Sequence, residues 1–283
     1  MLRPVMHDSI WAFDAEWVPD PATGRRVLDL PGDMPDEEVV ERMWAQGGAT
    51  EAEPRPYLKT ILCRVVSIAV VIRHQEEGSP EVHHRLFALP EGTTPLPEDE
   101  LLRRFLIKLG DGNRNGRKPQ LVGFNSRDAD LPILAQRAMV HRLSIPGLGR
   151  SGEKWAKDDF FDRYGTQHVD LREASGAWGK AGSTLHELAT ACGIPGKLGT
   201  DGKSVIDLWR AGDVAGIVRY NQFDALTTFL VWLRAMTLSG HLSPEQMAAE
   251  EASIRSLVEQ KALQDPGFSA YLAGWDRLAG KPT

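Results

Sequence analysis

Short apolar segments rich in β-branched residues mark the first part of the chain. SIWAF at 9–13 predicts a buried strand. ILCRVVSIAVVIR at 61–73 predicts a longer central strand, and VHHRLFAL at 82–89 follows a turn-like segment, so we expect these two to pair antiparallel. QLVGF at 120–124 predicts a further strand, and HVDL at 168–171 suits a short one.

Apolar residues recur at helical spacing between and after these strands. Ser183 is the expected N-cap of one helix, with Glu187 in its first turn and Gly193 at its end. Ser243 and Gln246 have capping-box spacing and predict an added C-terminal helix packed on the domain. This alternation predicts a mixed α/β sheet with helices packed on it. The other predicted helices cover 98–109, 131–143, 204–212 and 213–240.

Two segments interrupt this pattern. Residues 19–58 are rich in Pro, Gly and acids; DEEVVERMW at 36–44 predicts a short helix, and the remainder predicts a long loop. Residues 144–167 form a second irregular insert. We expect one domain over residues 1–283, with these two inserts and a C-terminal helical extension at 241–283.

Composition and charge narrow the class of protein. The 283 residues are 42% hydrophobic and 25% charged, which is ordinary for a globular protein. A formal net charge of −6 argues against a protein that coats a nucleic acid duplex, but not against an enzyme that grips a strand end. The sequence shows neither a membrane span nor a signal peptide, and Cys63 and Cys192 fit buried reduced thiols. A cytoplasmic location is therefore expected.

Asp14 and Glu16 follow the first predicted strand, two positions apart, so both carboxylates leave the same face. Two like charges on one face of a core strand are costly unless a cation or hydrogen-bond donors neutralise them. The alternative is that the strand has ended and both acids are solvated in a turn.

Asp130 lies where the strand at 120–124 gives way to a helix, with Pro132 in its first turn. A helix N-cap is one interpretation of this acid, and a metal ligand is the other. Asp128, two residues earlier, is a rival for the ligand role.

Tyr220 and Asp224 are four residues apart on a predicted helix and share one face. A carboxylate and a phenol on a face that is otherwise apolar need a partner, unless the helix is a boundary helix with a solvated Asp. The other inward-facing residues of this helix are Ile217, Leu226, Phe229, Leu230 and Leu233.

The three segments in this order resemble the DEDD superfamily of 3′-5′ exonucleases, in its tyrosine subgroup. GFNSRDADLPIL, HVDL, GIPGK and GKSVIDLWRAGDVAGIVRYNQFDALTTFLVWLR also resemble a bacterial family of predicted exonucleases related to the exonuclease domain of family B DNA polymerases. The resemblance runs from about residue 9 to the helices before 260 and is weakest in the two inserts. It implies an RNase H-like mixed central sheet flanked by helices. Its Asp-Leu-Pro motif favours Asp130 over Asp128, although Ala129 stands where the family usually has an aromatic residue.

The resemblance also implies a reaction. Asp14, Glu16 and Asp224 would hold a catalytic metal, Asp14 would bridge to a second one, Asp130 would reach that second metal partly through water, and Tyr220 would orient the attacking water. Hydrolysis of a phosphodiester fits two divalent cations in a cradle of carboxylates. Oxygen ligands favour Mg²⁺ or Mn²⁺, and the sequence has no His/Cys cluster with zinc-ligand spacing.

Three residues are candidates for contact with the substrate strand. Asn125 would contact the terminal nucleotide, and Trp17 or Phe124 would stack on a base. Core packing is the alternative for both aromatic residues, and for Phe124 it is the preferred interpretation.

Three further residues have weaker claims. Asp170 in HVDL matches a family position near the active site, or caps a turn. Lys197 and Lys203 flank a glycine-rich segment and would meet backbone phosphate, unless they are ordinary solvated lysines.

The expected function is exonucleolytic hydrolysis from the 3′ end of single-stranded nucleic acid, with DNA favoured, releasing nucleoside 5′-monophosphates. A 3′-5′ exoribonuclease in RNA maturation is the first alternative, because fold does not fix function. A nucleic-acid-binding module without catalysis is the second, although it would not need all five motif residues. A metallohydrolase of small phosphoesters is a more remote one.

Overall fold

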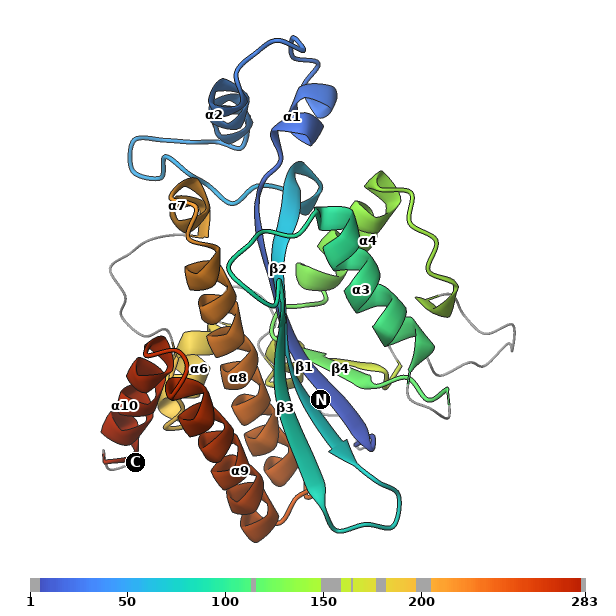
Figure 1. Cartoon of the computed structure of the whole chain (residues 1–283), viewed down its shortest axis with the longest axis vertical. Helices are drawn as coiled ribbons and strands as arrows, with labels where there is room; N and C mark the ends of the chain where they lie inside the picture. Colours follow the sequence, from blue (N-terminus) through green and yellow to red (C-terminus); the bar gives the residue numbers. More distant parts are fainter. Residues whose placement is uncertain are drawn as a thin grey trace.

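A five-stranded sheet in the order β3-β2-β1-β4-β5 forms the centre of the molecule (Figure 1). The computed structural model describes residues 6–112, 116–148, 159–163, 165–176, 182–196 and 205–280. The strands are β1 (Ser9–Pro19), β2 (Cys63–Gln75), β3 (Val82–Leu89), β4 (Gln120–Gly123) and β5 (His168–Asp170).

The directions of the strands define the fold. β1 pairs antiparallel with β2, and β2 pairs antiparallel with β3, which confirms the predicted pairing of these two. β4 runs parallel to β1, and β5 runs parallel to β4. A mixed sheet with this order and these directions, covered by helices on both faces, is the RNase H-like fold that the resemblance implied.

Helices cover both faces of the sheet because β1 alternates its side chains between two apolar clusters. Trp11 and Phe13 pack with α3 and α4 on one face, and Ile10 and Ala12 pack with α8 on the other. The helices are α1 (Pro21–Val27), α2 (Asp36–Gln46), α3 (Glu98–Asp111), α4 (Asp130–Val140), α5 (Leu171–Ala174), α6 (Leu185–Ala191), α7 (Val205–Arg210), α8 (Val214–Leu238), α9 (Pro244–Ala262) and α10 (Gly267–Ala279), with short 3₁₀ turns at Thr60–Leu62 and Pro146–Leu148.

The helix α8 spans 25 residues and crosses the sheet over β1 and β2. Asp213 caps it by accepting a hydrogen bond from the Gly216 amide at 2.8 Å. On its other side, the ring of Phe223 lies 5.1 Å from the rings of both Phe268 and Tyr271 in α10. The C-terminal helices therefore pack directly on the helix that carries part of the candidate site.

Three details of the predicted helices were wrong. Pro21–Val27 forms α1 where a loop was expected, because Asp20 caps its first turn. Thr184 rather than Ser183 caps α6, since only Thr184 lies three residues before Glu187 and completes a capping box. The tail forms two helices, α9 and α10, instead of one.

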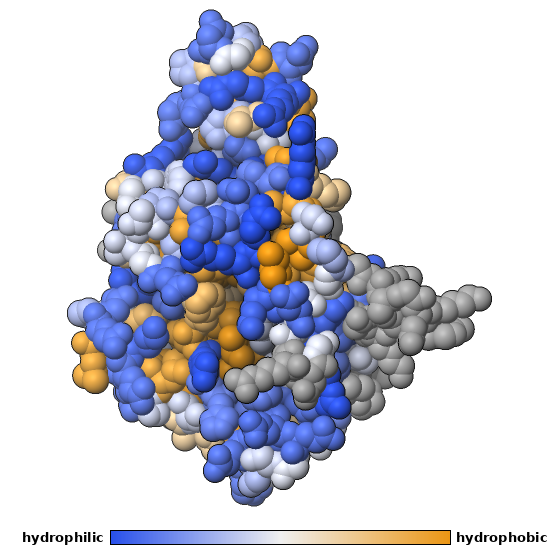
Figure 2. Space-filling view, turned by 45° about the vertical axis from the view of Figure 1, so that its right-hand side comes forward, coloured by the Kyte–Doolittle hydropathy of each residue, from blue (hydrophilic) through white to orange (hydrophobic). Residues whose placement is uncertain are grey.

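The insert at 19–58 forms a lobe beyond the end of the sheet, built from α1 and α2 (Figure 1). In the view of Figure 2 hydrophilic side chains cover most of this lobe, and apolar side chains gather below it. Cys63 and Cys192 are free thiols. Within the described ranges, none of the helices combines the length and the apolar character that a membrane crossing requires.

Candidate active site

The strand β1 carries Asp14 and Glu16 inside the sheet rather than beyond it. It continues to Pro19, so the alternative that places both acids in a turn is wrong. Antiparallel pairing sets Asp14 opposite Ala69 and Glu16 opposite Ser67. These short β2 side chains leave space above the two carboxylates on the α8 face.

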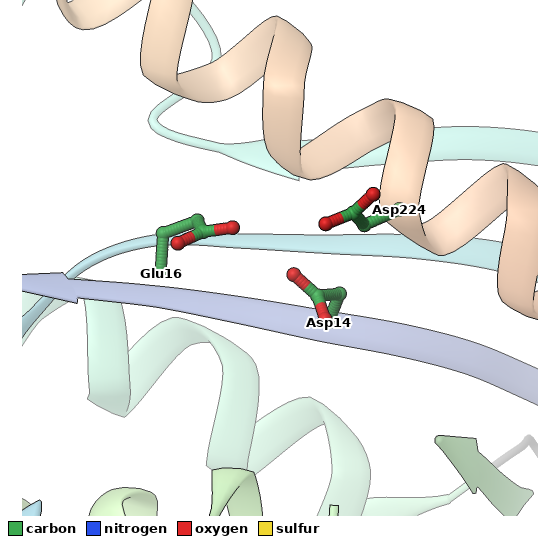
Figure 3. Close-up of side chains that lie close together, drawn as sticks. All are labelled: Asp14, Glu16 and Asp224. Atoms are coloured by element: carbon green, nitrogen blue, oxygen red, sulfur yellow. The ribbon is translucent and has the colours of Figure 1, made fainter. Parts of the chain in front are cut away.

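The helix α8 brings a third carboxylate to this face. One oxygen each from Asp14, Glu16 and Asp224 forms a group in which all the atoms lie within 4.8 Å of one another. Figure 3 shows the three carboxylates pointing toward one another, two from β1 and one from α8. Asp224 therefore faces β1, and all three carboxylates are half-buried.

Negative charge accumulates at this position. The pKa of Asp14 is raised well above its usual value, first by burial and then by the charges of Asp130, Glu16 and Asp224. Ionisation of all the carboxylates at this spacing is energetically unfavourable unless a cation binds between them. This concentration of negative charge suits a site for divalent cations, whose positive charge would offset that of the carboxylates.

Asp130 reaches β1 at the edge of the strand that β4 leaves unpaired. It is the first residue of α4, whose N-cap is Ala129, so its carboxylate is not the helix cap. Because β4 ends at Gly123, the amide of Ala15 has no partner strand on that side, and it donates to Asp130 Oδ1 at 3.0 Å. The rival Asp128 is exposed. The structure thus places Asp130, not Asp128, beside the acids of β1.

Burial raises the pKa of Asp130 to about 7, although the amide of Ala15 opposes the shift. Because a cation binds the ionised carboxylate, affinity for Mn²⁺ is expected to rise between about pH 6 and pH 8, and binding near pH 7 is expected to release a proton. Calorimetry in two buffers of different ionisation enthalpy measures both quantities. In Asp130→Asn the proton release should be smaller; the same release from both proteins would assign the proton to another group.

Tyr220 lies one turn before Asp224 and hydrogen-bonds its side chain. Burial raises the pKa of this phenol, and the charges of Asp224, Glu16 and Asp14 raise it further. The phenol is therefore neutral at physiological pH and acts as a hydrogen-bonding group, not as a base.

Asn221 is a polar residue of the site that the sequence patterns did not single out. It is fully buried, and its Nδ2 donates to Asp14 Oδ2 at 3.3 Å, while its Oδ1 makes no hydrogen bond. Asn221 lies three residues before Asp224, and residues at positions i and i+3 share a helix face, so this spacing could have indicated that Asn221 faces the site. Asn221 orients the Asp14 carboxylate toward the other acids.

The candidate substrate contacts have different surroundings. Trp17 is half-buried against the cluster that includes α4 and touches the ring of Tyr57. Phe124 packs against the cluster beneath α8, in agreement with the preferred core interpretation. Asn125 has a positive φ of 59° in the turn after β4, and its Oδ1 accepts from Arg172 Nη1 at 2.6 Å.

Of the two interpretations of Asp170, the structure shows the cap: its side chain accepts hydrogen bonds from backbone amides at the start of α5. Its Oδ1 accepts from the amides of Asn125 at 3.0 Å and Arg172 at 2.9 Å, and its Oδ2 accepts from the amide of Arg127 at 2.9 Å. Asp170 thereby holds the turn that leads to Asp130. Lys197 and Lys203 lie outside the described residues.

An RNase H-like sheet with a cluster of carboxylates on its central strand is an arrangement suited to metal-dependent hydrolysis of phosphodiesters, the chemistry of nucleases. The sequence model of a family described as "predicted 3′-5′ exonuclease related to the exonuclease domain of PolB" matches residues 55–275. The chain belongs to this family. The match begins at Arg55, so Asp14 and Glu16 lie before the matched range.

Among solved structures, the chain is similar to the family B DNA polymerase from the hyperthermophilic archaeon Pyrobaculum calidifontis, with 16% identity and a TM-score of 0.45. The similarity covers 92% of this chain and 29% of the polymerase, so the chain spans less than a third of that protein's length. No curated protein matches the chain.

Proposed function

We propose that this chain is a two-metal-ion 3′-5′ exonuclease of the DEDD superfamily, in its tyrosine subgroup. The observation that carries the proposal is the convergence of Asp14, Glu16 and Asp224 within 4.8 Å in a member of a family of predicted 3′-5′ exonucleases. Single-stranded DNA is the favoured substrate and nucleoside 5′-monophosphates are the products. We further propose that the sheet and its helices act as one domain, in the cytoplasm, where free thiols stay reduced.

The donor atoms fit hard divalent cations. They are all carboxylate oxygens, and the pKa of Asp14 is raised first by burial and then by the neighbouring carboxylates, so its ionised form is favoured by a bound cation. Asp14, Glu16 and Asp224 would hold one Mg²⁺ or Mn²⁺, and Asp130 with Asp14 would hold the second. When bound, the cations supply an acidified water and offset charge on the attacking and leaving oxygens.

The chain's own residues position these groups. Asn221 fixes Asp14 through the hydrogen bond to Oδ2, and the amide of Ala15 fixes Asp130. Tyr220, neutral and hydrogen-bonded to Asp224, would orient the attacking water with its hydroxyl. Because the water is oriented by a hydroxyl on a packed helix, little reorganisation is needed as the reaction proceeds.

Tyr220→Phe is expected to lower kcat by about 10²-fold while the affinity for Mn²⁺ changes little, because the ring remains and only the orienting hydroxyl is lost. Single-turnover cleavage and metal titration measure the two quantities. An equal loss of metal affinity would place Tyr220 among the groups that build the metal site instead.

The proposed activity is tested with single-stranded DNA and RNA oligonucleotides labelled at the 5′ end, incubated with Mg²⁺ or Mn²⁺. We expect a ladder that shortens from the 3′ end, disappears with EDTA and forms faster on DNA. Faster shortening of RNA would favour the exoribonuclease alternative. Tight binding without cleavage under any metal would favour the binding module.

A further inference from the structure

Tyr57 is the most exposed of the exposed aromatic side chains in the described residues, with 67% of its surface accessible. A single exposed ring is common on protein surfaces and needs no explanation by itself. Its surroundings therefore decide whether it has a function. Tyr57 lies at the end of the insert at 19–58, to which no sequence motif assigns a function.

Tyr57 packs against the strand that carries two of the acids. The centre of its ring lies 6.5 Å from that of Trp17 in β1, with the two planes at 82°. Burial, then Cys63 and the charge of Asp130, raise the pKa of Tyr57. The phenol therefore lies within electrostatic reach of Asp130.

Alternation along β1 determines the direction of Trp17. Its side chain lies on the same face as Trp11 and Phe13, in the apolar cluster with α3 and α4, and on the face opposite Glu16. Asp130 is the first residue of α4, so Tyr57 and Trp17 form an aromatic pair on the α4 side of the sheet.

The backbone around Tyr57 is held on both sides. Arg55 Nη1 pairs with Asp207 Oδ1 of α7 at 2.6 Å, and its guanidinium lies 5.6 Å from the ring centre of Trp44 in α2. Pro56 restricts φ, and Leu58 is buried with 6% exposure. The ring is presented to solvent by a fixed segment, so little conformational entropy is lost when a ligand stacks on it.

We propose that Tyr57, with Trp17 against it, is a stacking platform for one base of a single strand whose 3′ end lies in the active site. This inference rests on the proposed exonuclease function and names the feature of the substrate that is recognised: an unstacked base next to the scissile bond. Aromatic stacking accepts every base, so the platform selects single-stranded ends over paired ones without reading sequence.

The test measures binding of fluorescent single-stranded DNA in the Asp14→Asn background, where cleavage does not interfere. Tyr57→Ala is expected to weaken binding about 10- to 100-fold, while Tyr57→Phe keeps the ring and binds normally. Phe87→Ala, on the edge strand β3, is the matched control because it also removes an exposed ring (39%). Thermal unfolding checks that all variants are folded.

A second arm places an abasic nucleotide at each of the last few positions in turn. When the abasic nucleotide occupies the position that stacks on Tyr57, the protein with Tyr57 and the Tyr57→Ala variant are expected to bind the strand with equal affinity. The stacking contact between base and ring is then absent in both complexes. Equal weakening by Tyr57→Ala at every position, or no weakening at all, overturns the platform. Failure of the proposed function gives a different result: protein with an intact Asp14 leaves every oligonucleotide uncut.

Discussion

Asp14→Asn is expected to abolish exonuclease activity and, without divalent cations, to raise the melting temperature. In the proposed mechanism Asp14 is a ligand shared between two cations, and its loss removes several kcal/mol of charge stabilisation, which corresponds to a rate loss on the order of 10³-fold or more. The gain in stability has the same origin. Because the folded-state pKa of Asp14 lies above its unfolded value, ionisation of this carboxylate destabilises the fold as pH rises through that interval. The uncharged amide removes this penalty.

The matched control is Asp128→Asn, which removes one exposed charge two residues from Asp130 and should keep both activity and melting temperature. Single-turnover cleavage and thermal unfolding in EDTA at about pH 8, which lies above the unfolded-state pKa of an aspartate, measure the two effects. A lower melting temperature for Asp14→Asn would mean that Asp14 is stabilised by its neighbours, and the metal-site interpretation would lose its electrostatic support.

Glu250→Ala is expected to destabilise the protein by about 3–5 kcal/mol, because it leaves the buried guanidinium of Arg73 without its counter-ion. Glu250 Oε1 and Oε2 each accept a hydrogen bond from Arg73 at 2.8 Å, and Oε2 also contacts His84 Nε2 at 3.2 Å. Arg73 is 1% exposed and Glu250 5%. The pair joins β2 to α9, on the far end of the strand from the candidate site.

The neighbouring Glu251→Ala is the control for this substitution. Glu251 pairs with Arg234 at 2.9 Å, but their side chains are 23% and 29% exposed, so the loss should be about 0–1 kcal/mol. Urea unfolding measures both variants, which replace neighbouring glutamates of α9 with the same residue. If the two substitutions cost the same, the buried pair contributes no more than an exposed one.

Elements with strong periodicity were predictable from sequence. β2, β3 and α8 were each recognised, because their apolar residues decide the structure locally. α1 was missed, since its stability depends on the Asp20 cap and on packing against α2, neither of which a Pro-rich segment reveals. The cap of α6 was placed one residue early because Ser183 and Thr184 are equally good caps, and only the spacing to Glu187 separates them.

The acids and the tyrosine of the candidate site were predictable from sequence, but the contacts between them were not. Strand and helix spacing indicated Asp14 with Glu16 and Tyr220 with Asp224, while Asp130 depended on family resemblance. The hydrogen bond from Ala15 to Asp130 arises from the early end of β4, which a single sequence does not show. Asn221 was not predicted because its hydrogen-bond partner, Asp14, lies on β1, far away in sequence.

The packing of α10 on α8 ties the C-terminal extension to the chemistry of the site. Phe223 touches Phe268 and Tyr271, and it directly precedes Asp224, while Thr227 Oγ1 and Tyr271 Oη lie 3.1 Å apart. Local opening of α10 would therefore expose the turn of α8 that holds Asp224. Amide hydrogens of the two helices should exchange with solvent as one cooperative unit. A C-terminal tag or fusion that displaces residues 267–279 would therefore be expected to lower activity, although none of the acids of the site lies in this segment.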